Sequence, residues 1–201
     1  MTTARDQAFD ALLKKLAPDV IRSNLVRAGL FLAGWEFLKS EIEKKVREFY
    51  MVDLDPGPIS AQRYATKVLA LDSGPEKGKV FRASMQWLVD GGALTEIQVA
   101  RIREMRQRRN EIAHELPKIL VNAEHPGIDV ALVRELRDII AALGRFWGRI
   151  EIDTDEELAG RDIADADIIS GLSLLMEHLV AAAELSAKDP PSPVPFESST
   201  P

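Results

Sequence analysis

Residues 29–50, "GLFLAGWEFLKSEIEKKVREFY", decide the fold of this 201-residue chain. In this stretch and the turns before it, apolar side chains recur every three or four positions, as Leu25, Ala28, Leu32, Trp35, Leu38, Ile42, Val46 and Phe49. Charged residues fill the other side, so the pattern predicts one long amphipathic helix from Ile21 onward. Thirty residues correspond to about 45 Å of helix, which is longer than a small globular domain needs.

The rest of the chain also follows a helical period, interrupted by glycine, proline and aspartate. "DLDPGP" (53–58) ends the long helix, and the predicted helices that follow cover 60–71, 80–89, 95–116, 129–150 and 162–185. Thr95 and Gln98 form a capping box at the start of the third of these, and Thr154 with Glu157 repeats the pattern. Pro117 disfavours helical geometry in Leu116 and is expected to end the helix there.

These patterns predict an all-α protein: a helical bundle of about five to seven helices, with no convincing strand and no internal repeat. We expect a single domain over residues 1–186. The Pro- and Ser-rich residues 187–201 are expected to form a disordered tail.

Composition excludes several classes of function. The chain has no cysteine, which rules out disulfides, thiolate catalysis and thiolate-bound zinc, and no histidine has a partner at metal-ligand spacing. We therefore expect neither a metal nor a cofactor. The charged N-terminus does not resemble a signal peptide, and no apolar run approaches the ~20 residues that span a bilayer, so a cytoplasmic protein without a membrane partner is expected.

The formal net charge of −6 conceals two strongly charged segments. Residues 101–109 are basic, with five arginines against Glu104, whereas residues 151–167 are acidic. A globally acidic protein can still bind an anion if its basic groups converge on one face. The acidic segment is interpreted as a solvated helix face, or alternatively as a cover for the basic helix when its site is empty.

The basic segment leads into "RRNEIAHE" (108–115), where Arg109 is out of place. On a helical wheel, Arg108 points to solvent but Arg109 lies in the middle of an apolar stripe. Five apolar residues fall within roughly 60° on either side of Arg109: Ile102, Met105, Ile112, Ala113 and Leu116. A guanidinium there must be paired or hydrogen-bonded, because burying an unpaired charge costs several kcal/mol.

Four polar residues border this stripe on one flank: Arg103, Arg106, Asn110 and His114. Arginine can clamp a phosphate, the asparagine amide can donate to it, and histidine can move a proton near neutral pH. A purely structural interpretation remains open. Arg109 can pair with Glu36 or Glu41 of another helix, and the helix dipole alone favours a histidine near a C-terminus.

Other residues and motifs are weaker candidates for a functional site. His125 and His178 stand alone, and "DSGPEKGK" (72–79) lacks the pattern of a phosphate-binding loop and is interpreted as a turn. Trp35, Trp87 and Trp147 fall on apolar faces and are expected to pack in the core.

"RNEIAH" (109–114), an arginine followed by asparagine and, after three more residues, histidine, resembles the signature of HEPN domains. Those are helical bundles found in prokaryotic toxins, phage-defence proteins and RNA-processing enzymes. The stretch 29–50 is similar to the early helix of that family, and the resemblance covers about residues 20–150.

The resemblance implies a metal-independent endoribonuclease in which two copies form one composite cleft. His114 would be the general acid or base, Arg109 would stabilise charge on the phosphorane, and Asn110 would hold the phosphate or position His114. Arg103 and Arg106 would bind substrate. The implied partners are RNA, a second copy of the chain and a possible cognate antitoxin.

Two departures qualify these implications. A subfamily of toxins has a tyrosine two residues after the histidine, which the partner antitoxin modifies, but this chain has Leu116 there. Other members have lost catalysis, so the alternative is a non-catalytic helical module that binds a nucleotide, a nucleic acid or a protein.

Overall fold

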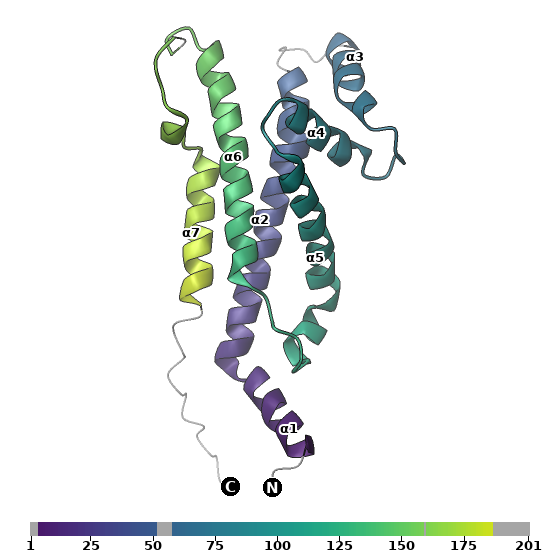
Figure 1. Ribbon diagram of the computed structural model, residues 1–201, viewed down its shortest axis with the longest axis vertical. Helices are drawn as coiled ribbons and strands as arrows, with labels where there is room; N and C mark the ends of the chain where they lie inside the picture. Colours follow the sequence, from purple (N-terminus) through teal and green to yellow (C-terminus); the bar gives the residue numbers. More distant parts are fainter. Residues whose placement is uncertain (1–3, 52–57, 159, 187–201) are drawn as a thin grey trace, which may run out of the picture.

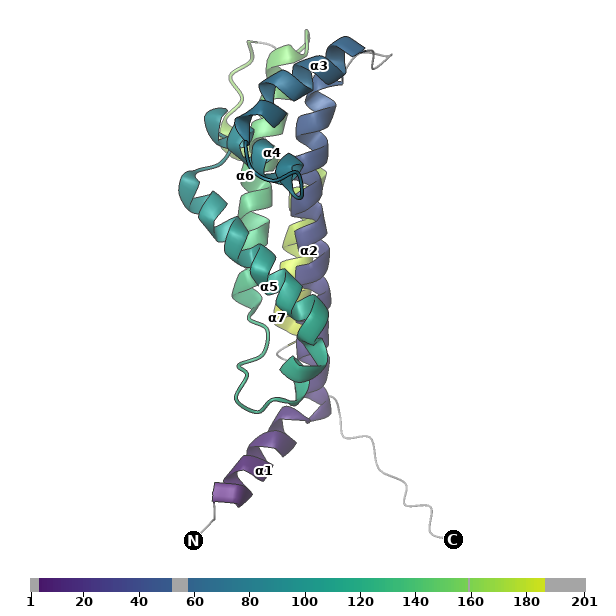
Figure 2. The ribbon, with the colours of Figure 1, turned by 90° about the vertical axis from the view of Figure 1, so that its right-hand side faces the viewer.

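The computed structural model describes residues 4–51, 58–158 and 160–186 (Figures 1 and 2). Within these residues there are seven α-helices, two short 3-10 helices and no strand, which confirms the all-α prediction. The elements are α1 (Ala4–Lys15), α2 (Pro18–Tyr50), α3 (Pro58–Lys67), η1 (Leu69–Leu71), α4 (Lys79–Asp90), α5 (Glu96–Val121), α6 (Val130–Thr154), η2 (Asp165–Asp167) and α7 (Gly171–Leu185). The expected tail, 187–201, lies outside the described residues.

Helix α2 is the axis of the bundle. It contacts α3, α4, α5, α6 and α7, with α6 and α7 on one side in Figure 1 and α4 and α5 on the other. The predicted apolar stripe is confirmed in its middle part, where Trp35, Leu38 and Ile42 are buried. Because α2 is covered on more than one side, Phe31 is also fully buried, while the end positions Leu25 and Phe49 are 45% and 40% exposed.

Helix α5 carries the candidate motif, and its start agrees with the sequence. The amide of Gln98 donates to Thr95 Oγ1 (3.2 Å) and the amide of Thr95 donates to Gln98 Oε1 (2.8 Å), which confirms the capping box. The predicted end at Leu116 is wrong, because the helix continues through Pro117 to Val121. This extra turn is stabilised by the burial of Ile119, which is only 1% exposed.

The region after α6 differs most from the prediction. Thr154 is helical and its hydroxyl donates to the carbonyl of Ile150 (2.8 Å), so the second capping box is wrong. The last helix begins at Gly171, where Ser170 Oγ accepts from the amide of Ser173 (3.1 Å). The predicted start near residue 162 is therefore also wrong.

Residues 161–170 run instead along α6. Arg149 donates to Asp165 and to the carbonyl of Ile163, and a Cβ on Gly148 would overlap Ile168. These contacts keep the acidic segment on the side of α6 away from α5 (Figure 1). The described residues of this segment do not cover the basic helix.

The tryptophans pack as expected. Trp35 and Trp147 are 3% and 7% exposed, and the half-buried Trp87 stacks on Trp147 with ring centroids 5.9 Å apart. None of the described helices combines the length and the apolar composition required to cross a bilayer.

Candidate functional site

Arg109 lies where α5 passes α2. Its Nη2 donates to Glu36 Oε1 (2.8 Å) and its Nη1 to Asn110 Oδ1 (3.3 Å), whereas its Nε is buried without a partner in the described part of the chain. Glu36, one of the two acids proposed for it, is therefore confirmed as its ion-pair partner. The two side chains are 35% and 51% exposed, so the pair contributes only about 0–1 kcal/mol to stability.

A cleft of about 470 Å³ opens beside this ion pair, between α2, α5 and the start of α4. Three of the five predicted site residues line it, namely Arg106, Arg109 and Asn110. Arg103 and His114 do not. The other polar residues of its wall are Glu36, Lys39, Glu43 and Lys77.

The cleft holds two more cations than carboxylates. Glu36 neutralises Arg109, and Lys39 Nζ lies 3.8 Å from Glu43 Oε2. Arg106 and Lys77 have no carboxylate within 4 Å among the described residues; the guanidinium of Arg106 instead lies 5.6 Å from the ring centroid of Phe81. Two uncompensated cations in one cleft favour an anionic ligand.

The N-terminus of α4 adds to this positive potential. Gly78, its N-cap, also lines the cleft and has φ +78°, a left-handed conformation that glycine adopts without strain. No side chain caps this end of the helix, so the partial positive charge of its first turn stays available to an anion.

Lys77 and Gly78 belong to the segment 72–79, which the sequence presents only as a turn. The segment is fixed by Asp72, whose Oδ2 accepts from Arg82 Nε (3.1 Å) and Nη2 (2.7 Å). The hydrogen bonds from Arg82 hold the pKa of the Asp72 carboxyl below its ordinary value. Sequence reasoning missed Lys77; the signal that could have revealed it is a lysine and a glycine just before a helix start.

His114 is exposed on α5, one turn beyond Asn110 on the same face. Its side chain has no hydrogen bond or ion pair within the described part of the chain, and it is absent from the lining of the cleft. Arg103 is likewise exposed and outside the lining. The chain by itself therefore presents a cationic cleft of about 470 Å³ with His114 outside it.

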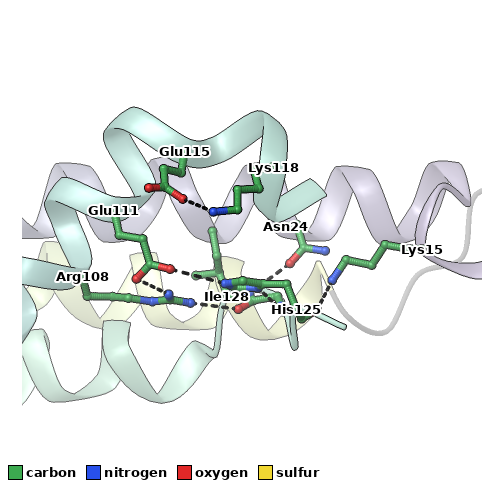
Figure 3. A network of polar contacts seen from close by, with 9 residues as sticks. Lys15, Asn24, Arg108, Glu111, Glu115, Lys118, His125 and Ile128 are labelled. Carbon is green, nitrogen blue, oxygen red and sulfur yellow. Dashed lines mark hydrogen bonds and ion pairs between the residues drawn. The ribbon is translucent and has the colours of Figure 1, made fainter. Parts of the chain in front are cut away.

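The expectation that Arg108 points to solvent is wrong. Its side chain is 23% exposed, forms an ion pair with Glu111 and donates from Nη2 to the carbonyl of Gly127 (3.2 Å). The loop after α5 returns along this flank and buries it (Figure 3). His125 Nε2 lies 3.5 Å from Glu111 Oε1, and Arg108, then His125, hold the pKa of Glu111 below its ordinary value.

Comparison with known proteins adds no relative. No protein-family model matches the chain, and neither curated proteins nor solved structures match it.

Proposed function

We propose that the chain is a metal-independent endoribonuclease of a toxin or phage-defence system and works as a homodimer. One observation carries the proposal: Arg106, Arg109 and Asn110 line a cleft with an excess of two cations, and His114 lies one helical turn away. The resemblance of residues 109–114 to the HEPN signature supplies the reaction.

The proposed roles follow from the chemistry of RNA. The ribose 2′-oxygen attacks the adjacent phosphorus, the bond to the 5′-oxygen breaks, and the products are a 2′,3′-cyclic phosphate and a 5′-hydroxyl. His114 takes the 2′-hydroxyl proton or supplies the proton to the leaving 5′-oxygen. Arg109 stabilises charge on the phosphorane once the phosphate displaces Glu36, and Asn110 donates to a phosphate oxygen.

The homodimer is part of the proposal because of where His114 lies. An exposed histidine outside its own cleft acts on a bound phosphate if a second copy brings its α5 alongside. Arg106 and Lys77 then contact the phosphates next to the scissile one, and Arg103, which lies outside the cleft, contacts the strand beyond them. A cognate antitoxin is the further partner proposed for a toxin.

A second candidate is a non-catalytic module that binds a nucleotide, a nucleic acid or a protein through the same cleft. Two observations favour it. Glu36 already neutralises Arg109, and His114 has no hydrogen bond from the described residues to orient its ring. Catalytic histidines are usually oriented by such a partner.

The two candidates differ in one experiment. The purified protein is incubated in excess EDTA with a mixed RNA pool and, separately, with the same pool methylated on every 2′-oxygen. The ribonuclease cuts only the unmethylated pool and leaves 2′,3′-cyclic phosphate ends. A module that binds nucleic acid cuts neither pool but binds both, with an affinity that Arg109→Gln lowers. Cleavage of the methylated pool contradicts the proposed reaction.

A further inference from the structure

Arg27, on α2, is a half-buried arginine that has no carboxylate partner among the described residues. Seven arginines in the described part of the chain are half-buried, and six of them have a carboxylate within 4 Å. Those six are Arg82, Arg101, Arg108, Arg109, Arg137 and Arg149. Arg27 has only the carbonyl of Ile128, 3.3 Å from its Nη1, and its Nε is buried without a partner.

An unpaired guanidinium in this position is costly. Taking a charge partly out of water carries a desolvation penalty that a neutral carbonyl offsets only in part. A guanidinium with free N–H groups is also the side chain best suited to a phosphate, because its planar fork donates two parallel hydrogen bonds. None of the described residues therefore gives Arg27 an anionic partner.

Arg27 lines an open cleft of about 450 Å³ between α1, α2 and the loop after α5. Lys14 and Lys15 of α1 also line it, and Asp19 is its only carboxylate. Its two lysines and Arg27 therefore exceed its carboxylate by two charges. It is distinct from the Arg109 cleft, because Arg27 and Glu36 are nine residues apart on α2, about 14 Å along the helix and half a turn around it.

The loop wall of this cleft is held rigidly (Figure 3). The buried Asn24 donates from Nδ2 to the carbonyl of Val20 (3.0 Å) and accepts from the amide of Ile128 at Oδ1 (3.0 Å). His125 Nδ1 accepts from the amide of Gly127 (3.0 Å), and Lys15 Nζ donates to the carbonyl of His125. A wall fixed in this way does not have to be ordered when a ligand binds.

We propose that this cleft binds a terminal phosphate, a phosphomonoester dianion, with Arg27 as the bidentate donor and Lys14 as a second cation. The excess of two positive charges matches a dianion better than the single charge of a carboxylate. The site does not depend on RNA cleavage, since it shares no residue with the Arg109 cleft.

The test follows the backbone amide resonances of Ala123 and His125, which line the cleft, in the ¹⁵N-labelled full chain while inorganic phosphate is added. Wild type is expected to show saturable shifts of both resonances. Arg27→Gln raises the dissociation constant at least about tenfold, the effect of one charge-assisted contact. Arg161→Gln, an exposed arginine with the same change of charge, and Arg109→Gln leave it unchanged.

Lys14→Gln provides a second variant that does not risk the fold, because Lys14 is exposed and without a side-chain partner among the described residues. It is expected to weaken phosphate binding about threefold, as for an exposed charge. Unchanged binding in both Arg27→Gln and Lys14→Gln, or no shift of Ala123 and His125 in wild type with any probe, would overturn the proposal.

Further probes identify the source of the phosphate. They are a 5′-phosphorylated hexanucleotide, its 5′-hydroxyl twin, and vesicles that contain phosphatidic acid. An Arg27-dependent response to the phosphorylated oligonucleotide identifies a nucleic-acid end, and one to the vesicles identifies a lipid headgroup. An equal response to the 5′-hydroxyl twin contradicts a terminal phosphate.

Discussion

Replacing Glu36 by glutamine should strengthen the binding of RNA to the Arg109 cleft. Glu36 Oε1 accepts from Arg109 Nη2 at 2.8 Å, so in the free protein this carboxylate holds the guanidinium that the phosphate requires. Glutamine keeps the shape of the side chain and an oxygen that can accept the same hydrogen bond, but it removes the negative charge. The phosphate then no longer competes with a carboxylate.

The size of the effect follows from the exposure of the pair. With side chains 35% and 51% exposed, the attraction is screened by solvent and amounts to no more than about 1 kcal/mol. Releasing it lowers the dissociation constant for RNA by up to about fivefold. The free energy of unfolding should fall by no more than the same amount, about 1 kcal/mol.

The assay is fluorescence anisotropy with a labelled single-stranded RNA at about 50 mM salt, repeated at about 300 mM, where the gain should shrink. Glu43→Gln is the matched control. It removes a second carboxylate from the same cleft, but Glu43 pairs with Lys39 at 3.8 Å rather than with Arg109. Weaker binding by Glu36→Gln, or an equal gain from Glu43→Gln, would refute the competition.

Two other predictions concern the loop after α5. Gly127→Ala should lower the free energy of unfolding by about 2 kcal/mol, because φ is +90° and the new Cβ would lie 2.5 Å from Asn24 Oδ1. In urea titrations Gly127→Ala should lower the free energy of unfolding more than Gly160→Ala, because Gly160 has a similar φ (+83°) but open space around it. Equal losses of stability would contradict the steric argument. Arg108 holds the pKa of Glu111 below 4.5 in the folded protein. The stability that this ion pair contributes is therefore complete above that pH and is lost as the pH falls through the pKa of Glu111 in the folded state. Glu111→Gln should therefore lose less stability than wild type between about pH 6 and pH 3.5, and parallel losses would show that this pair is not responsible.

The sequence predicted what depends on contacts close along the chain. The stripe around Trp35, Leu38 and Ile42 identified α2, and Thr95 with Gln98 identified the start of α5. Helical geometry also indicated that Arg109 needs a partner, because its neighbours at three and four residues are apolar. Glu36 was one of the two acids on another helix that were proposed as this partner.

Features set by distant contacts were not predictable in the same way. The helix continues past Pro117 because Ile119 reaches a core built by other helices. Residues 161–170 leave the helical path because Arg149 and Gly148 of α6 hold them. Arg108 is half-buried rather than solvated because the loop around Gly127 covers it. Each of these outcomes depends on a partner far away in the sequence.

The candidate site shows the same difference between features set by nearby contacts and features set by distant contacts. Arg109 of the apolar stripe and Arg106 and Asn110 of its polar flank share the cleft in the structure. Lys77 enters from a loop about thirty residues earlier, which helical periodicity on α5 does not detect. His114 lies on the predicted flank but beyond the end of the cleft, since the wheel gives direction around the helix and not depth along it.

The most direct measurement is the rate of RNA cleavage in excess EDTA by wild type and by His114→Ala. A positioned acid or base contributes about 10²–10⁴-fold, so we predict a loss of at least about 100-fold in His114→Ala with unchanged helicity. His178→Ala, which removes another exposed histidine on α7, should cleave like wild type. Equal cleavage by wild type and His114→Ala would contradict the assignment of His114, and with it the proposed ribonuclease site.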